Sequence, residues 1–159
     1  MDGKRLAAVV LWQSNFSCTS TETRLETAMA DVRVICAIGK RGQLGLHGQL
    51  PWEGNRGPEY RADVARFFAM TRGHVLIAGP RTIASFPDWA RPRMTLVEIR
   101  STDEPEKILA RYSDRVVFIG GGPPVWKAYA SFVSHWDITR LPYDGEADRY
   151  FDPSWLFAR

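Results

Sequence analysis

Short runs rich in valine and isoleucine alternate with helical patterns along most of this chain, and no other feature constrains its fold as strongly. The runs are mostly bounded by glycine or proline, as buried strands are. They span residues 32–38, 74–78, 94–99, 115–119 and 136–141. Strands that alternate with helices form a mainly parallel sheet, because each parallel pair needs a crossover connection. We therefore predict an α/β fold with a central, mostly parallel twisted sheet flanked by helices.

The clearest helix is predicted to begin at Gly57-Pro58-Glu59. Proline suits the first turn because no N–H is needed there, and glutamate suits it because the helix dipole favours negative charge. The apolar face of this helix consists of Tyr60, Val64, Phe67 and Phe68. Asp63 lies on or beside that face, which is an unusual place for a carboxylate.

Two further helices are predicted, and the second follows a run of three glycines. The first covers residues 104–112, and the second begins at Pro123-Pro124, directly after Gly120, Gly121 and Gly122. Its inner side carries Val125, Trp126, Tyr129 and Phe132. Glycines between a strand and a helix let the backbone approach a phosphate, whose charge the helix amides receive. The run lacks both the GxGxxG pattern and a P-loop lysine, so by itself it is equally typical of a tight turn.

A second junction of strand and helix, Gly79-Pro80-Arg81-Thr82, strengthens the prediction of a nucleotide site. An arginine and a hydroxyl here add hydrogen-bond donors to the turn. Arg100 ends the next strand, from which its side chain can reach the same phosphate. Two phosphate-accepting turns at one edge of a sheet favour a dinucleotide.

Asp63 is the main candidate for chemistry. On an exposed helix face it would pair with Arg66 or Arg56, which is the more usual arrangement for an aspartate. If the face lines a pocket, burial raises the pKa of Asp63. A carboxylate between Trp52 and Phe67 can then hold an amidine-like ring edge and help to protonate it.

Composition narrows the function classes. The 159 residues suffice for one domain, and the net charge of +3 is too small an excess to predict binding to nucleic acid. No apolar run approaches the roughly 18 residues of a membrane-spanning helix. Cys18 and Cys36 show no CxxC spacing, which predicts a reducing cytoplasm and no metal site. His47, His74 and His135 are scattered, and the serines lack an elbow motif, so hydrolase chemistry has little support.

The first thirty residues differ from the rest of the chain. They are rich in serine and threonine without a sustained period, and Met29 directly precedes the first strong strand. We expect residues 1–30 to be a leader or the product of a mis-called start, with an export signal as the lesser alternative. Residues 31–159 are then the catalytic domain.

Several blocks, in their order and spacing, resemble the dihydrofolate reductase family. They are Ile35-Cys36-Ala37-Ile38, Leu44-Gly45, Gln49-Leu50-Pro51-Trp52, Asp63 with Phe67 and Thr71, residues 75–82, Ser85-Phe86-Pro87, residues 119–126, Thr139, and Ala147-Asp148 before Phe151. The resemblance covers about residues 32–153. Within this family the chain looks most like the bacterial dihydromethanopterin reductases, which are short relatives of dihydrofolate reductase.

The resemblance implies that NADPH reduces 7,8-dihydromethanopterin, or alternatively 7,8-dihydrofolate, by hydride transfer to the pterin ring. It implies that Asp63 holds the 2-amino and N3 edge of the pterin, that Thr139 supports it, and that Trp52 supports a nearby water. The implied cofactor-binding residues are Ala37, Leu44, Gly79, Arg81, Thr82, Arg100, Gly120, Gly121, Gly122, Val125 and Trp126, with residues 44–50 as a mobile loop. The implied substrate-binding residues are Cys36, Leu50, Val64, Phe67, Ser85, Phe86 and Ile119. One glycine pair, either Gly120-Gly121 or Gly121-Gly122, is expected to be cis.

The chain also departs from the family pattern. Residues 53–60 are surplus between Trp52 and Asp63 and are expected at the mouth of the pocket. The sequence stops soon after Phe151-Asp152-Pro153, where the family continues into a hairpin, so we expect strand 136–141 at an open edge and a possible homodimer across it. Arg93 stands about where the family binds the folate carboxylate, although Arg91 is close by. A pterin-binding or nucleotide-binding protein without catalysis is the remaining alternative.

Overall fold

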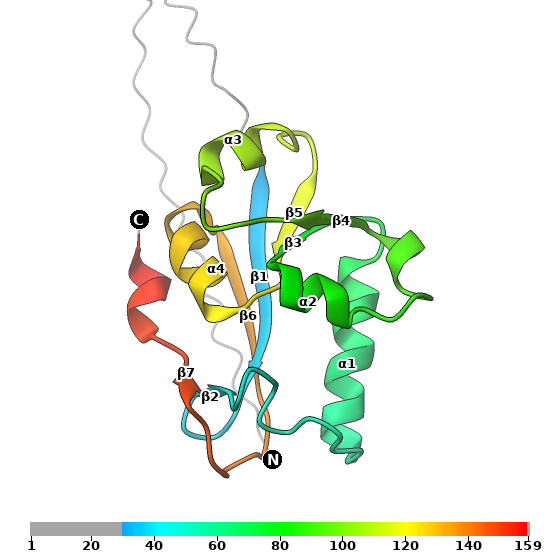
Figure 1. Ribbon diagram of the computed structural model, residues 1–159, viewed down its shortest axis with the longest axis vertical. Coiled ribbons are helices and arrows are strands. Elements are labelled where there is room, and N and C mark those ends of the chain that lie inside the picture. The colour runs from blue at the N-terminus through cyan, green and yellow to red at the C-terminus, as the bar shows by residue number, and fades with distance from the viewer. Residues whose placement is uncertain (1–29, 159) are drawn as a thin grey trace, which may run out of the picture.

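A five-stranded parallel sheet forms the centre of the protein. The computed structural model describes residues 30–158, so the expectation for residues 1–30 falls almost wholly outside the described residues. The strands are β1 (Asp31–Ile38), β3 (Val75–Ala78), β4 (Thr95–Glu98), β5 (Val116–Ile119) and β6 (His135–Arg140). Their order is β4-β3-β5-β1-β6, and every adjacent pair is parallel (Figure 1). The predicted strands and the predicted α/β class are confirmed.

Each α-helix begins with proline in its first turn, where the missing N–H breaks no helical hydrogen bond. The helices are α1 (Pro58–Thr71), α2 (Pro80–Ser85), α3 (Pro105–Ala110) and α4 (Pro123–Tyr129). Short 3₁₀ turns cover Arg91–Arg93, Ala130–Phe132 and Pro153–Phe157. The prediction for residues 104–112 was too long at both ends, because Glu104 and Arg111 are the capping residues of α3.

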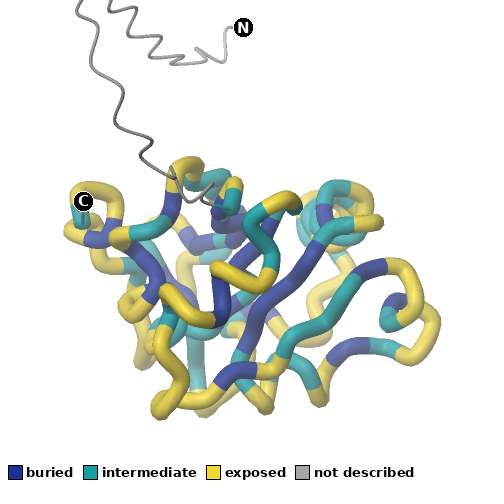
Figure 2. Tube along the Cα trace, turned by 90° about the horizontal axis from the view of Figure 1, so that it is seen from above, coloured by how far each residue is buried: buried dark blue, intermediate teal, exposed yellow. Residues whose placement is uncertain are grey.

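The sheet separates two hydrophobic clusters, because successive side chains of a strand point to opposite faces. Ile35 of β1 belongs to the cluster that includes Phe86 and receives Phe67 and Phe68 of α1. Val34, Cys36 and Ile38 of the same strand belong to the larger cluster, together with buried residues of α3 and α4. Figure 2 shows the strands as the most buried part of the chain. The helix α1 therefore packs on one face of the sheet, and α3 and α4 pack on the other.

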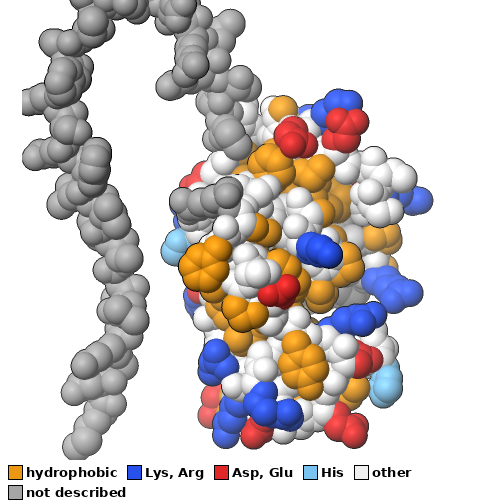
Figure 3. All heavy atoms as spheres, turned by 90° about the vertical axis from the view of Figure 1, so that its left-hand side faces the viewer, with side chains coloured by type: hydrophobic (Ala, Val, Ile, Leu, Met, Phe, Trp, Pro, Cys, Tyr) orange, Lys and Arg blue, Asp and Glu red, His pale blue; other side chains and the backbone are white. Residues whose placement is uncertain are grey.

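A second, two-stranded sheet lies beside the first. Its strands, β2 (Gln43–Gly45) and β7 (Arg149–Tyr150), pair in antiparallel fashion. Because β7 pairs with β2 and not with β6, strand β6 is an edge strand of the central sheet within residues 30–158, as expected. Figure 3 shows hydrophobic side chains exposed among charged ones on the side where the C-terminal segment lies. The homodimer across β6 stays a prediction.

The C-terminal segment packs an aromatic cluster against the larger core. Trp155 is buried, and its ring lies 5.2 Å from that of Phe151 and 6.2 Å from that of Trp126, between centroids. The ring of Phe151 in turn contacts Trp136 of β6 edge-on, at 5.7 Å. The segment after β7 thus covers one face of the edge strand with aromatic side chains.

Truncation of Trp155 is expected to destabilise the fold. Trp155→Ala removes a buried ring and should lower the free energy of unfolding by about 3 kcal/mol. Phe157→Ala is the matched control, because Phe157 is 81% exposed and its loss should change stability by less than about 0.5 kcal/mol. Urea unfolding followed by circular dichroism measures both values. Equal stability of the two variants would contradict this account of the segment.

Candidate active site

The two glycine turns predicted from the sequence lie side by side. They follow β3 and β5, which are neighbours in the sheet, and the Gly79 N–H donates to the Gly121 carbonyl at 3.1 Å. The Gly121-Gly122 peptide is cis, which decides between the two pairs that the sequence left open. Gly121 has a φ of +108°, and a Cβ there would lie 3.1 Å from the Trp126 ring, so only glycine fits. A Cβ added to Gly122 meets no atom within 4 Å, so the backbone is open to a ligand there.

Exposed donors surround the glycine turns. Arg81 is exposed at the start of α2, where Thr82 follows it. A Cβ added to Gly48 would lie 3.7 Å from Nη1 of Arg81, so the loop after β2 comes close to this arginine. Arg100 has a side chain that is 74% exposed, and its Nη2 lies 3.5 Å from Oε1 of Glu98. These groups fit the phosphates of a dinucleotide, because they combine open backbone with guanidinium donors.

Asp63 is half-buried on α1 and faces strand β6. Burial raises its pKa, and the negative charge of Asp137 raises it further. The Thr139 hydroxyl, by hydrogen bonding, and the positive charge of Arg66 act in the opposite direction. Thr139 is the register partner of Ala37 on β1, so Ala37 lies directly beside it in the sheet. The structure therefore brings together Asp63, Thr139 and Ala37, three of the predicted site residues.

Two charged residues at this position, Arg66 and Asp137, were not predicted from the sequence to be part of the site. Arg66 does not pair with Asp63, as one alternative supposed. Its Nη1 donates to Oγ1 of Thr139 at 2.9 Å, and its Nη2 forms an ion pair with Asp137. Asp137 and Thr139 are two positions apart on β6, so their side chains share one face of the strand. The sequence already showed that Asp137 and Thr139 are two positions apart on one strand. It did not show that Arg66 of α1 lies against them.

Four predicted site residues have their side chains in the hydrophobic core. They are Cys36, Leu44, Ile119 and Trp126, all within the larger cluster. Cys36 and Ala37 are adjacent on β1, so their side chains point to opposite faces, and only Ala37 shares the face of Asp63. Leu44, expected in a mobile loop, lies instead in β2 and is buried. These four side chains therefore pack in the core, and the binding roles expected for them stay predictions.

A groove of about 700 Å³ runs along the outer side of α1. Leu50, Trp52 and Val64 of the predicted site line it, and Val64 is 53% exposed there rather than buried as expected. Other lining residues are Glu53, Gly54, Asn55 and Tyr60 from the surplus segment, and Arg61, Phe68, Arg72, Trp89 and Arg93. The surplus residues therefore do lie at a groove. The three arginines make it basic.

Several other residues named in the sequence analysis are absent from the lining of this groove. Phe86 is buried, with its ring 6.0 Å from that of Phe67. Ser85 is exposed, and its hydroxyl donates to the Thr82 carbonyl at 2.7 Å. Val125 lies over Gly79, since a Cβ added to that glycine would be 3.8 Å from its Cγ2. Arg91 donates to the Ile83 carbonyl at 2.9 Å, so of Arg91 and Arg93 only Arg93 lines the groove.

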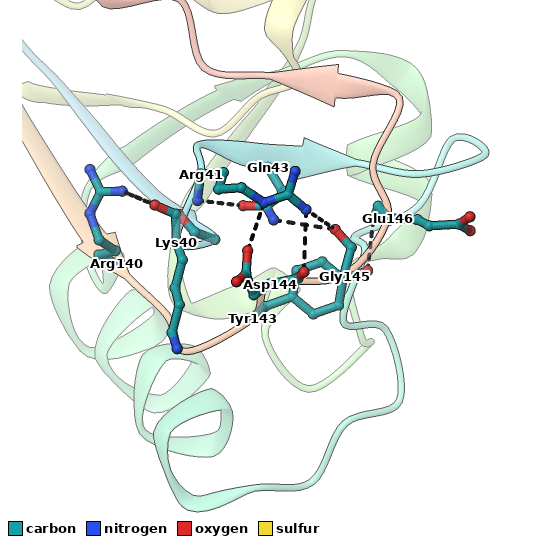
Figure 4. A network of polar contacts seen from close by, with 9 residues as sticks. Lys40, Arg41, Gln43, Arg140, Tyr143, Asp144, Gly145 and Glu146 are labelled. Carbon is teal, nitrogen blue, oxygen red and sulfur yellow. Dashed lines mark hydrogen bonds and ion pairs between the residues drawn. The ribbon is translucent and has the colours of Figure 1, made fainter.

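A polar network holds the loop after β6 against the turn after β1 (Figure 4). Arg41 bonds Asp144 through Nε at 2.7 Å, and buried Gln43 accepts from the Arg41 N–H and donates to the Gly145 carbonyl. The Tyr143 ring in this loop contacts Trp52 edge-on, at 5.6 Å between centroids. The network thereby fixes Trp52, which is buried beside the groove.

Two kinds of feature are absent from residues 30–158. No group of three or more His, Cys, Asp or Glu side chains is placed to hold a metal ion. No helix in the same range is long and apolar enough to cross a membrane.

The Cys36 thiol is expected to be unreactive in the native protein. Burial, with the charges of Asp63 and Asp137, raises its pKa to about 12, so roughly one thiol in ten thousand is ionised at pH 8. In a Cys18→Ser variant, the reaction with Ellman's reagent at pH 8 should be at least about 100-fold slower in native protein than in urea-unfolded protein. Similar rates in the two states would show that Cys36 is accessible and easily ionised.

Comparison with known proteins places this fold in a family. The sequence profile of the dihydrofolate reductase family matches residues 31–156. Dihydromethanopterin reductase of Methylorubrum extorquens is 62% identical over 128 residues, which cover 80% of this chain and 95% of that protein. Dihydrofolate reductase type 9 of Escherichia coli is 28% identical, over 79% of this chain and 78% of that protein. Dihydrofolate reductase type 8 of Escherichia coli is 25% identical, over 78% of this chain and 82% of that protein. With its parallel sheet, its glycine turns and Asp63 facing β6, the chain belongs to the dihydrofolate reductase family.

Proposed function

We propose that this protein is an NADPH-dependent oxidoreductase that reduces 7,8-dihydromethanopterin to 5,6,7,8-tetrahydromethanopterin. The observation that carries the proposal is half-buried Asp63, which faces Thr139 and Ala37 one strand away from the glycine turn after β5. The choice of substrate is supported by the 62% identity to dihydromethanopterin reductase. The expectations of a cytoplasmic protein that binds neither membranes nor nucleic acid belong to the same proposal.

The phosphates of NADPH would bind at the two glycine turns. The open backbone at Gly122 would approach the pyrophosphate, while Arg81, Thr82 and Arg100 would bind the adenosine 2′-phosphate. The small side chain of Ala37 would leave room for the nicotinamide against β1. When bound, NADPH supplies a hydride from its C4 to C6 of the pterin, and the protein contributes alignment and electrostatics.

Asp63 would bind the 2-amino and N3 edge of the pterin with its two carboxylate oxygens. Its raised pKa suits this role, because the same loss of solvation that raises the pKa leaves the carboxyl group free to bind and polarise the ring. Thr139 would hold the carboxylate in place from β6, and Trp52 would shield a water that delivers the proton to N5. Hydride addition at C6 and protonation at N5 together reduce the C=N bond.

The basic groove would bind the part of the substrate that extends beyond the pterin. Arg61, Arg72 and Arg93 line it together with the rings of Phe68 and Trp89. Guanidinium groups bind phosphate and carboxylate strongly, so this wall favours a pterin with an anionic substituent. Arg93 also supports the alternative substrate, 7,8-dihydrofolate, as do the two more distant relatives. A binding protein without catalysis is the third alternative.

Turnover with both dihydropterins tests the proposal. With NADPH and purified protein, the fall in absorbance at 340 nm should be fast with dihydromethanopterin and slow with dihydrofolate. Asp63→Asn should lower kcat/KM at neutral pH by roughly 100-fold or more, as expected for loss of a general acid. A variant with near wild-type turnover would contradict the role of Asp63. Binding of NADPH without its oxidation by either pterin would support the binding-protein alternative.

Stability measured on the same Asp63→Asn variant provides a second readout. Folding raises the pKa of Asp63, so the charged carboxylate destabilises the native state when the pH is above the pKa of the unfolded chain, near 3.8. This loss of stability disappears as the pH falls below that value. Asp63→Asn should therefore unfold at a higher urea concentration than wild type at pH 7, and at a similar one near pH 4. Loss of stability at pH 7 would mean that the ionised carboxylate stabilises the fold.

The choice of cofactor rests on the arginines near α2. Arg81→Ala should raise KM for NADPH by roughly tenfold, because it removes a charge-assisted contact to the 2′-phosphate, and it should leave KM for NADH unchanged. Arg111→Ala is the matched control, since Arg111 is an exposed arginine at the end of α3, which leads into the amino end of β5. An equal rise in KM for both cofactors would show that Arg81 does not contact the 2′-phosphate.

A further inference from the structure

Arg66 is held in one position by two partners on the same strand. Its Nη1 donates to Thr139 Oγ1 at 2.9 Å, while its Nη2 pairs with Asp137. The side chains of Arg66 and Asp137 are 39% and 21% exposed, so water screens this ion pair only partly. Arg66 lies three residues after Asp63 on α1, one helical turn away. The guanidinium is therefore close enough for its charge to act on the carboxylate that we assign to the pterin.

The contact between Arg66 and Thr139 sets the direction of the threonine hydroxyl. A guanidinium can only donate hydrogen bonds, so Oγ1 of Thr139 accepts from Arg66. The single proton of the hydroxyl remains free to be donated elsewhere. Asp63 is near this hydroxyl, which lowers the pKa of the carboxyl group, and it is the acceptor that we assign to the hydroxyl proton. The arginine thus directs the hydroxyl proton toward the carboxylate.

The two charges of the pair act on Asp63 in opposite directions. The positive charge of Arg66 favours the ionised carboxylate, and the negative charge of Asp137 disfavours it. The remaining titratable neighbour is Cys36 of β1, which is coupled to both aspartates but stays neutral at working pH because its pKa is about 12. Arg66 and Asp137 are thus the two charged groups that act on Asp63, in addition to its burial and the Thr139 hydroxyl.

We propose that Arg66, anchored by Asp137, is a positioning residue for the reaction: it orients the Thr139 hydroxyl toward Asp63 and balances the charge that this carboxylate meets. The inference rests on the proposed function, because it assigns the pterin-binding role to Asp63. Asp137 is the counterpart that keeps the guanidinium against Thr139. Neither residue needs to touch the substrate.

Substitutions of the two partners should have opposite effects. In Arg66→Gln, Asp137 is left without its counter-charge and the pKa of Asp63 should rise. In Asp137→Asn, the repulsion is removed and the pKa of Asp63 should fall. The midpoint of the pH profile of kcat/KM should move up in the first variant and down in the second. Arg66→Gln should also lower kcat/KM at neutral pH by roughly tenfold, because the Thr139 hydroxyl loses its fixed direction.

Matched variants separate positioning from a purely structural role. Arg66→Lys keeps the charge and should retain most of the wild-type pH profile. The double variant R66Q/D137N removes both charges and should return the midpoint of the pH profile toward the wild-type value. It also serves as the second variant if either single variant folds poorly. Arg33→Gln is the control, because it breaks an ion pair with Asp31 at the opposite end of β1 and should leave the profile unchanged.

A measurement on the protein without ligands distinguishes failure of this inference from failure of the proposed function. The carboxyl carbon of Asp63, assigned with the help of Asp63→Asn, is titrated by NMR in wild type, Arg66→Gln and Asp137→Asn. Opposite shifts of its midpoint support the inference even if neither dihydropterin is reduced, a result that would refute only the proposed function. Shifts in the same direction, or no shift in either variant, would overturn the inference whatever the activity.

Discussion

The parallel pairing of β1 with β6 on one side and β5 on the other is the constraint on which the site depends. Parallel strands bring their carboxyl ends to one edge of the sheet. This edge therefore carries Thr139 beside Ala37, and the glycine turn that follows β5 lies next to them. Burial of β1 on both faces keeps these groups in register. Without that pairing, the carboxylate of α1 would face solvent rather than a polar strand end.

The helix α1 is only partly buried, because one of its faces packs toward the sheet while the other lines the groove. Among its residues only Thr71 is fully buried, while Asp63 and Arg66 face β6 and Val64 lines the groove on the outer side. A carboxylate at such a position loses solvation, which raises its pKa, but the nearby hydroxyl and guanidinium limit the cost. The helix thus carries a half-buried carboxylate at the sheet and a basic, aromatic wall on its outer side.

Much of the fold was predictable from local patterns. The five strands agree with their predicted ranges to within one residue at every end, because runs of β-branched residues bounded by glycine and proline specify strands locally. The glycine turns were predictable for a similar reason, and so was the inward position of Asp63. Cys36 and Ile119 pack in the larger core cluster, and the two-residue period of a strand already assigns Cys36 and Ala37 to opposite faces.

The sequence by itself determined the order of strands and helices, the phosphate-type turns and the one carboxylate on an apolar helix. Only the tertiary structure decided that Arg66 pairs with Asp137, 71 residues away, rather than with Asp63 on its own helix. Only the structure decided that β7 pairs with β2 and that Gly121-Gly122 is the cis pair. The physical reason is range: backbone preferences and periodicity act over a few neighbouring residues. The partner of a long charged side chain depends instead on which distant segments the register and packing of the sheet bring within hydrogen-bonding distance.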